Sequence, residues 1–413
     1  MRASFLSIFR GKTLYWAYFY IICLYIVFLR VRFIPSTIAY LLYGISIAVA
    51  VFILSKSKLK AVGNKTDIIL ILFFMIYYII SSICFIGFGG APESTWLIKD
   101  WLYSLLPILF YILVRLSRYK IDEQILLETT LYSILILDII AIVIYAFPGS
   151  TIASMIDRES FEEEGYIYAL TGVCGVIVTG FLNVIGLSIC LLSQIKINRL
   201  LKVFCSILFV VCVFLAGQRT PIGGLVIVVF AYLIRFKGRG VLGLVVLLSL
   251  LVFAYNKIDY QVDDISVKEM MTERYLGRFD QLKSGDSNRN DQYEKTEDKN
   301  IFEYVFGSGV GKYSPENPYT KNAMPDAMLN RIYNEMGFVG LFTFLSFFFV
   351  NILVAIKKKN EFMIAFILYI FVANMFNRVL FIAPTSILPY VFVAFFNWRR
   401  YSSISLNSSK NEH

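Results

Sequence analysis

The sequence of 413 residues contains a single histidine, and that histidine is the last residue, His413. An acid–base site or a metal centre built on imidazole is therefore excluded from the body of the chain. Charged residues are also scarce, at 16% of the sequence, and the six cysteines lie in or beside apolar runs, as small buried side chains do. Hydrophobic residues, in contrast, make up 58% of the sequence, which is far too much for a soluble chain of this length.

The apolar residues are gathered in long runs. A helix needs about 20 such residues to cross a bilayer core of roughly 30 Å, and only helices or closed barrels satisfy their backbone in lipid. The sequence predicts an all-α, polytopic membrane protein with twelve transmembrane helices, at about 13–29, 34–54, 67–88, 96–114, 124–147, 167–193, 200–217, 219–234, 240–255, 337–356, 362–377 and 379–398. The first run is long and lacks a small-residue cleavage site, so a cleavable signal peptide is not expected.

Lysine and arginine are distributed unequally between alternate connections. One set of connections, which includes both chain ends, holds 22 of them. The short connections of the opposite set hold six: Arg30, Arg32, Lys99, Arg158, Arg219 and Arg378. Because basic residues accumulate on the cytoplasmic side, both termini are predicted to be cytoplasmic. Topology thus accounts for the net charge of +10, and no nucleic-acid partner is predicted.

A single membrane domain is expected over residues 1–401, followed by a disordered cytoplasmic tail at 402–413. The connection 256–326 is a large hydrophilic loop within this domain, and its position in the chain places it outside the cell. It contains an adjacent carboxylate pair, Asp263 and Asp264, without further ligands at useful spacing. No metal site and no cofactor are therefore predicted.

Two arginines lie at the turns of unusually short predicted hairpins. Only 35 residues separate Arg199 from Arg235, whereas two full spans need about 40. The turn that contains Arg219 is therefore expected to be recessed below the outer surface, and Arg378 occupies the turn of the hairpin after Lys359. Both guanidinium groups would then line an outer cavity; the alternative is that they reach out to lipid phosphate.

The segment 326–340 carries polar residues at helical spacing directly before an apolar run. Asp326, Asn330 and Asn334 fall on one face, with Arg331 and Glu335 beside them. This face suits the mouth of a cavity, and the alternative is an interfacial helix with an Arg331–Glu335 pair.

One ionisable residue, Asp138, lies within the fifth predicted span. Such a residue is by default a functional hypothesis, although structural pairing or a local water is the expected explanation here.

Three features together resemble a known family. Gly307-Ser308-Gly309-Val310-Gly311 is followed by a proline-rich gap and then by Asp326 and Glu335-Met336-Gly337-Phe338-Val339-Gly340-Leu341. This order, the Gln218-Arg219-Thr220 turn and the late outer loop resemble the bacterial O-antigen polymerase and O-antigen ligase superfamily. The resemblance covers about 200–345 by motif and the remainder by topology. It implies a GT-C-like glycosyltransferase architecture in the inner (cytoplasmic) membrane.

The resemblance implies glycosyl transfer on the outer face from a polyprenyl-diphosphate-linked oligosaccharide, in the synthesis of O-antigen, capsule or exopolysaccharide. Departure of the diphosphate requires preorganised cations, for which arginine is suited. The candidates for this role are Arg219, then Arg289 and Arg278 in the loop, then Arg378. Asp326 is the candidate catalytic base, with Glu335 as the second choice.

Ligases of the superfamily carry a His-Asn pair where this chain has Asp326-Ala327, which favours a polymerase. An O-antigen ligase-like transferase and, from another class, a flippase or transporter of the same lipid-linked oligosaccharide remain the alternatives. The implied partners are the lipid-linked substrate, membrane lipid, a chain-length regulator and a flippase.

Overall fold

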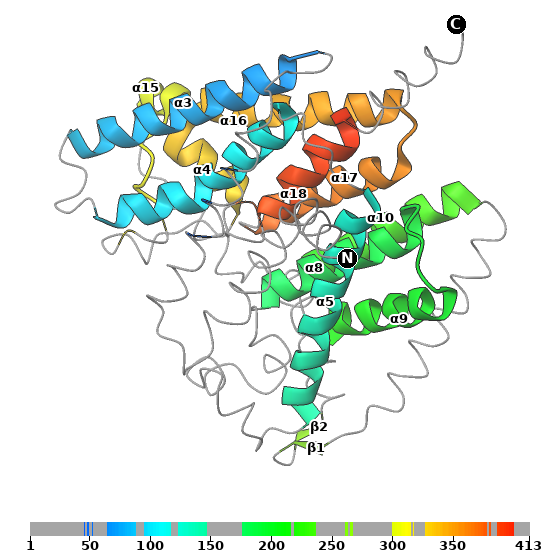
Figure 1. Cartoon of the computed structure of the whole chain (residues 1–413). Helices are drawn as coiled ribbons and strands as arrows, with labels where there is room; N and C mark the ends of the chain where they lie inside the picture. Colours follow the sequence, from blue (N-terminus) through cyan, green and yellow to red (C-terminus); the bar gives the residue numbers. More distant parts are fainter. Residues whose placement is uncertain are drawn as a thin grey trace, which may run out of the picture. The chain divides into compact units, whose positions relative to one another are not determined.

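The computed structural model describes residues 64–87, 95–116, 123–146, 176–215, 219–236, 261–262, 265–266, 300–314, 317, 327–377, 380 and 386–399, together with 45, 48 and 52 (Figure 1). Apart from one hairpin, the regular structure of this part of the chain is helical, as predicted. The hairpin joins β1 (Gln261–Val262) and β2 (Ile265–Ser266), two antiparallel strands of two residues each.

The observed helices overlap the predicted apolar runs, except for one short helix, Ile301–Phe306, which lies within the predicted outer loop. Their bounds are Thr66–Gly87 for α3, Thr95–Leu116 for α4, Glu123–Ala146 for α5, Val176–Leu192 for α8, Arg199–Leu215 for α9, Arg219–Phe236 for α10, Ile301–Phe306 for α15, Met328–Lys357 for α16, Glu361–Phe376 for α17 and Ile387–Phe392 for α18. A π-helical segment, η5 (Val393–Arg399), continues α18. The predicted runs at 13–29 and 240–255, and nearly all of the run at 34–54, lie outside the described residues.

The described helices belong to two compact units, and one of them contains α5, α8, α9 and α10. Helix α8 is its centre, because nearly all of its side chains are buried and it packs on the other three helices. Asp138 of α5 is also buried, and it accepts a hydrogen bond of 3.0 Å from the amide of Asn183 on α8. The structure thus gives Asp138 the structural pairing expected for it.

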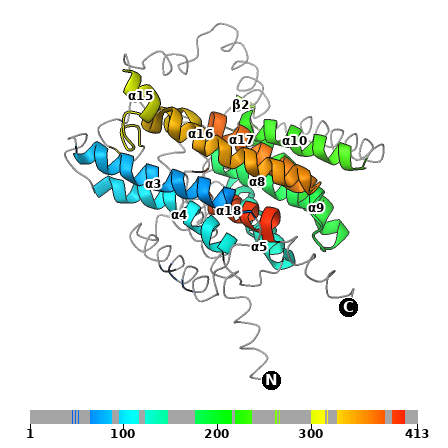
Figure 2. The ribbon, with the colours of Figure 1, turned by 90° about the horizontal axis from the view of Figure 1, so that it is seen from above.

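The other unit contains α3, α4, α15, α16, α17, α18 and η5. Its longest helix is α16, which packs on α3, α15 and α17, while α18 and η5 pack on α4. Figure 2 shows α3 and α16 running side by side, with α15 at one end of the pair.

Helices α3 and α16 have apolar side chains on both their packed and their exposed faces. In α3 the buried positions include Ile71, Phe74 and Tyr78, whereas Phe73 and Ile76 on the opposite side are exposed. A helix of a water-soluble domain carries polar residues on that opposite side. By length and composition, α3 and α16 are both able to cross a membrane; the other apolar helices in the described part of the chain are shorter or less apolar.

A buried ion pair joins α3 to α4 at the ends of these helices. The guanidinium Nε of Arg115 lies 3.0 Å from Oδ2 of Asp67, and the hydroxyl of Tyr111 donates to the same oxygen at 2.5 Å. The Arg115 guanidinium also lies 4.4 Å from the ring centroid of Trp398. Nearby, half-burial lowers the pKa of Lys358, and the charge of Arg115 lowers it further. Arg115 therefore joins η5 to this end of the unit as well as α3 to α4.

A kink at Gly337 divides α16 into a polar N-terminal part and an apolar C-terminal part. Gly337 has φ 62° and ψ −164°, which interrupts the helical backbone at the boundary where the sequence changes. A Cβ atom on Gly337 would lie 2.4 Å from the carbonyl oxygen of Val305, and one on Gly307 would lie 2.2 Å from that of Glu335. The two glycines therefore allow the backbones of α15 and α16 to touch.

Replacement of Gly337 by alanine is expected to destabilise this unit. The left-handed conformation costs a non-glycine residue about 1–3 kcal/mol, and the clash with the Val305 carbonyl adds to that cost. The measurement is the unfolding temperature of the purified protein in detergent. Gly87→Ala is the matched control because a Cβ there meets nothing within 4 Å. Equal unfolding temperatures for the two variants would contradict the close backbone contact.

Candidate functional site

The predicted polar face of the segment 326–340 is present on the N-terminal part of α16. The amide of Asn334 donates to the side-chain oxygen of Asn330 at 3.0 Å, which places the two on one face. Arg331 and Glu335 form the ion pair that was the alternative prediction, with 3.0 Å between Nε and Oε2. The pair is buried, however, and Arg331 is only 1% exposed. The Arg331–Glu335 pair is therefore buried within the protein and does not contact water, as an interfacial pair would.

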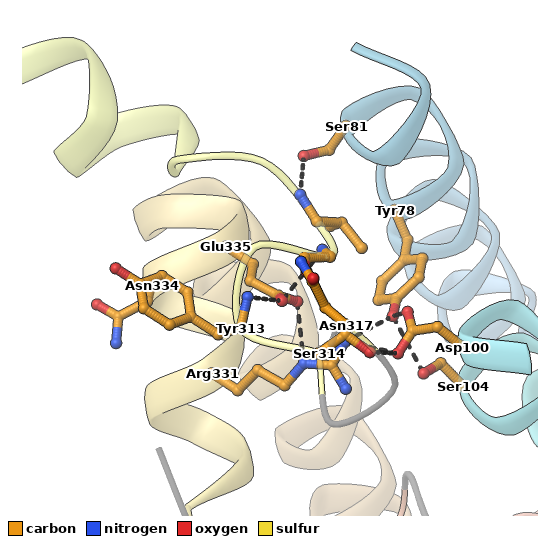
Figure 3. Close-up of polar contacts among 12 residues, drawn as sticks. Tyr78, Ser81, Asp100, Ser104, Tyr313, Ser314, Asn317, Arg331, Asn334 and Glu335 are labelled. Carbon is orange, nitrogen blue, oxygen red and sulfur yellow. Dashed lines mark hydrogen bonds and ion pairs between the residues drawn. The ribbon is translucent and has the colours of Figure 1, made fainter. Parts of the chain in front are cut away.

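Arg331 bridges two carboxylates that come from different helices. Its Nη2 atom lies 2.8 Å from Oδ1 of Asp100 on α4, while its Nε atom binds Glu335 (Figure 3). The distances correspond to charge-assisted hydrogen bonds on two sides of one guanidinium group. Arg331 thereby ties the N-terminal part of α16 to α4.

Asp100 receives further hydrogen bonds on both of its oxygens. The hydroxyl of Tyr78 on α3 donates to Oδ2 at 2.5 Å, and Oγ of Ser314 donates to Oδ1 at 2.7 Å. Ser104, one turn further along α4, lies 3.1 Å from the same tyrosine hydroxyl. Asp100 therefore connects α3, α4 and the segment after the glycine-rich run.

Glu335 holds the backbone of the glycine-rich segment 307–313. Its Oε1 atom accepts hydrogen bonds from the backbone N–H groups of Gly311 at 3.1 Å and Tyr313 at 2.9 Å. Its backbone carbonyl accepts one from the N–H of Gly309 at 3.0 Å. The loop is thus bound to α16 through both the side chain and the backbone of one residue.

The charges of the network are both paired and hydrogen-bonded. Two carboxylates share the charge of one guanidinium, and two hydroxyls and two backbone N–H groups donate hydrogen bonds to these carboxylates. Buried charges persist only when they are paired and hydrogen-bonded in this way. Because both oxygens of Glu335 are engaged, the geometry favours a structural role for this residue over that of a base.

The other predicted site residues are not brought together by the described part of the structure. Arg219 is the first residue of α10, in the unit that does not contain Glu335, and its side chain lies outside the described part of the structure. Asp326, Arg278, Arg289 and Arg378 also lie outside the described residues. Asp326 and Arg378 lie close in sequence to two described residues that are bonded to each other. The N–H of Met328 donates to the carbonyl of Asn377 at 3.4 Å.

Asp100 and Tyr78 were not among the residues that the sequence pattern predicted for the site. The signal for Asp100 was available, since an ionisable residue in an apolar run of 96–114 is costly unless it has a partner. Nothing in the sequence, however, pairs it with a residue 231 positions later. Within the described residues, no three His, Cys, Asp or Glu side chains are grouped as metal ligands.

Loss of the Arg331 charge is expected to unfold this unit rather than to change it locally. Arg331→Met leaves two buried carboxylates without their cation, and breaking a buried ion pair in this way costs about 3–5 kcal/mol. Lys357→Met removes the same charge at an exposed position of the same helix and is the control. The test is the yield of monodisperse protein and its unfolding temperature. An Arg331→Met protein with the same yield and unfolding temperature as the Lys357→Met control would contradict the structural role of the network.

A scan of the sequence against protein-family models gives no match, and no curated protein is significantly similar to it. The function proposed for this site therefore depends on its own residues and on the motif resemblance.

Proposed function

We propose that this chain is a polysaccharide repeat-unit polymerase of the O-antigen, capsule or exopolysaccharide type. It would transfer a growing glycan from polyprenyl diphosphate to a lipid-linked repeat unit at the outer face of the cytoplasmic membrane. In this proposal, the chain crosses that membrane twelve times and has both termini in the cytoplasm.

One observation carries most of the support for the proposal. The two parts of the motif, Gly307–Gly311 and Glu335–Gly340, form one structural element, in which Glu335 binds the loop and Gly337 lies against Gly307. Motif residues that contact one another in the fold support a family resemblance more strongly than their order in the sequence does alone. The contact between these two segments therefore supports the resemblance independently of the predicted topology.

The chemistry divides the candidate residues into two groups. Glu335 and Asp100 each bind Arg331 and each accept hydrogen bonds from the segment 311–314, so these three residues serve to hold that segment in place. Arg219, Arg289, Arg278 and Arg378 remain the candidates for binding the departing diphosphate, and Asp326 remains the candidate base. Asp326 and Arg378 adjoin the Met328–Asn377 backbone contact, which supports their assignment to one site.

Analysis of the glycolipids that accumulate after deletion of the gene tests the reaction itself. A polymerase is expected to leave single repeat units on polyprenyl diphosphate in the outer leaflet. Retention of these units in the inner leaflet would instead indicate a flippase. Finished polymer that stays on the polyprenyl carrier would indicate a ligase, and either result would overturn the proposal.

Arg219→Ala is expected to lower polymer synthesis by at least about 100-fold, the usual effect of removing one group that stabilises developing charge. The protein level and the amount of single-repeat glycolipid should not fall. Arg199→Ala is the matched control, because Arg199 begins α9 as Arg219 begins α10 but lies on the predicted cytoplasmic side. Normal polymer length in Arg219→Ala would exclude this arginine from the site.

Asp326→Asn and Glu335→Gln are expected to fail in different ways. If Asp326 is the base, Asp326→Asn should lower the rate by about 10²–10⁴ while the protein remains folded. Glu335→Gln removes one charge of a buried network and should instead lower the amount of folded protein. Immunoblotting of the membrane fraction beside polymer analysis separates the two effects. Full activity of Asp326→Asn would mean that this carboxylate is not the base.

A further inference from the structure

Helix α15 (Ile301–Phe306) differs from the other described helices of its unit because none of its residues is buried. Ile301 is 84% exposed, Phe302 67% and Phe306 44%, and Tyr304 and Val305 are exposed as well. Five large apolar side chains on one six-residue helix form an apolar surface that water solvates poorly.

Hydrogen bonds cap both ends of α15. The side chain of Asn300 accepts from the N–H of Glu303 at 2.8 Å, and the Glu303 carboxylate accepts from the N–H of Asn300 at 3.1 Å. This capping box occupies the only charged side chain of the helix. The N–H of Gly307 then closes the other end on the Glu303 carbonyl. Satisfied backbone groups reduce the cost of placing a helix end in an apolar medium.

The exposed surface of α15 is continuous with that of the two membrane-length helices. The hydroxyl of Tyr77 on α3 donates to the carbonyl of Phe306 at 2.7 Å, and the ring of Tyr77 stacks with that of the exposed Phe73. On α16, Phe338 directly follows the Gly337 contact with α15 and stacks with Phe342, which is 60% exposed. One apolar surface therefore extends over α15 and the outer faces of α3 and α16.

We propose that α15 is inserted into the membrane interface, where Ile301, Phe302 and Phe306 contact lipid acyl chains. Lipid is the occupant because a membrane that covers the exposed faces of α3 and α16 must also cover a surface continuous with them. A short apolar helix with capped ends lies in the plane of such an interface. This inference rests on the proposed membrane location and not on the polymerase reaction.

The insertion has a consequence for the glycine-rich loop. Gly307 directly follows α15, and Glu335 fixes the next residues of the loop to α16. The depth of α15 in the interface thus sets the height of the loop at the lipid headgroups. A substrate anchored in the same leaflet would present its diphosphate at that level.

Fluorescence quenching in proteoliposomes tests the insertion. Tryptophan is introduced by Phe302→Trp in the full chain, and the added fluorescence is measured in phosphatidylcholine vesicles with and without bromine on the acyl chains. Phe302 is largely exposed, so the substitution should not disturb folding. Phe342→Trp on α16 is the control for lipid contact of the span, and Tyr313→Trp in the glycine-rich segment 307–313 is the control for a half-buried position outside the exposed apolar surface.

The added fluorescence at position 302 is expected to be quenched by brominated lipid to at least half the extent seen at position 342, and iodide in the water should quench it weakly. Quenching at 302 by iodide alone would place α15 in water. Quenching by neither agent would show that protein covers it, either the same chain or a second copy. Either result would overturn the insertion of α15, and quenching of the tryptophan at position 342 by brominated lipid would still support the membrane location. If brominated lipid did not quench the tryptophan at position 342, both the insertion and the membrane location would be overturned.

Discussion

The ion network of Asp100, Arg331 and Glu335 is the interaction on which one compact unit depends. It joins α4, α16 and the glycine-rich loop through one guanidinium group, and Tyr78 adds α3. Desolvation of these charges is costly, so the network is stable only while every partner is present. The same condition gives it specificity, because a displaced helix would leave a buried carboxylate unpaired. In an apolar unit, where hydrophobic contacts tolerate sliding, the network fixes which helix positions face each other.

Glycine provides the second constraint, at the contact between α15 and α16. Gly307 and Gly337 both have positive φ, and each lies where a Cβ atom would collide with the backbone of the other segment. The close approach brings the N–H groups of the loop within reach of Glu335. The backbone contact and the ion network therefore depend on each other. The glycines permit the close approach of the two backbones, and the Glu335 carboxylate stabilises that approach. The element is thus held by a backbone contact and by hydrogen bonds together, as the supporting residues of a preorganised site are.

The sequence predicted the helices well because long apolar runs leave few alternatives in a backbone that must satisfy its own hydrogen bonds. Helices α3, α4 and α5 begin and end within two residues of the predicted runs. It did not predict the long-range contacts of the described site residues. Glu335 was a candidate base, whereas its two oxygens are occupied by Arg331 and by the N–H groups of the loop. Helical spacing showed that Arg331 and Glu335 are neighbours. It did not show that Asp100 binds the same guanidinium group.

The sequence by itself determined the helical class, the positions of the long described helices and the local Arg331–Glu335 pair, because these follow from hydropathy and from spacing within one helix. Only the tertiary structure decided that the pair is buried, that Asp100 and Tyr78 complete it, and that Glu335 binds the glycine-rich loop. The contacts of Arg331 with Asp100 and Tyr78 join residues more than 200 positions apart on three of the helices. Neither hydropathy nor periodicity contains information about which helices are neighbours, so partners of this kind emerge only from packing.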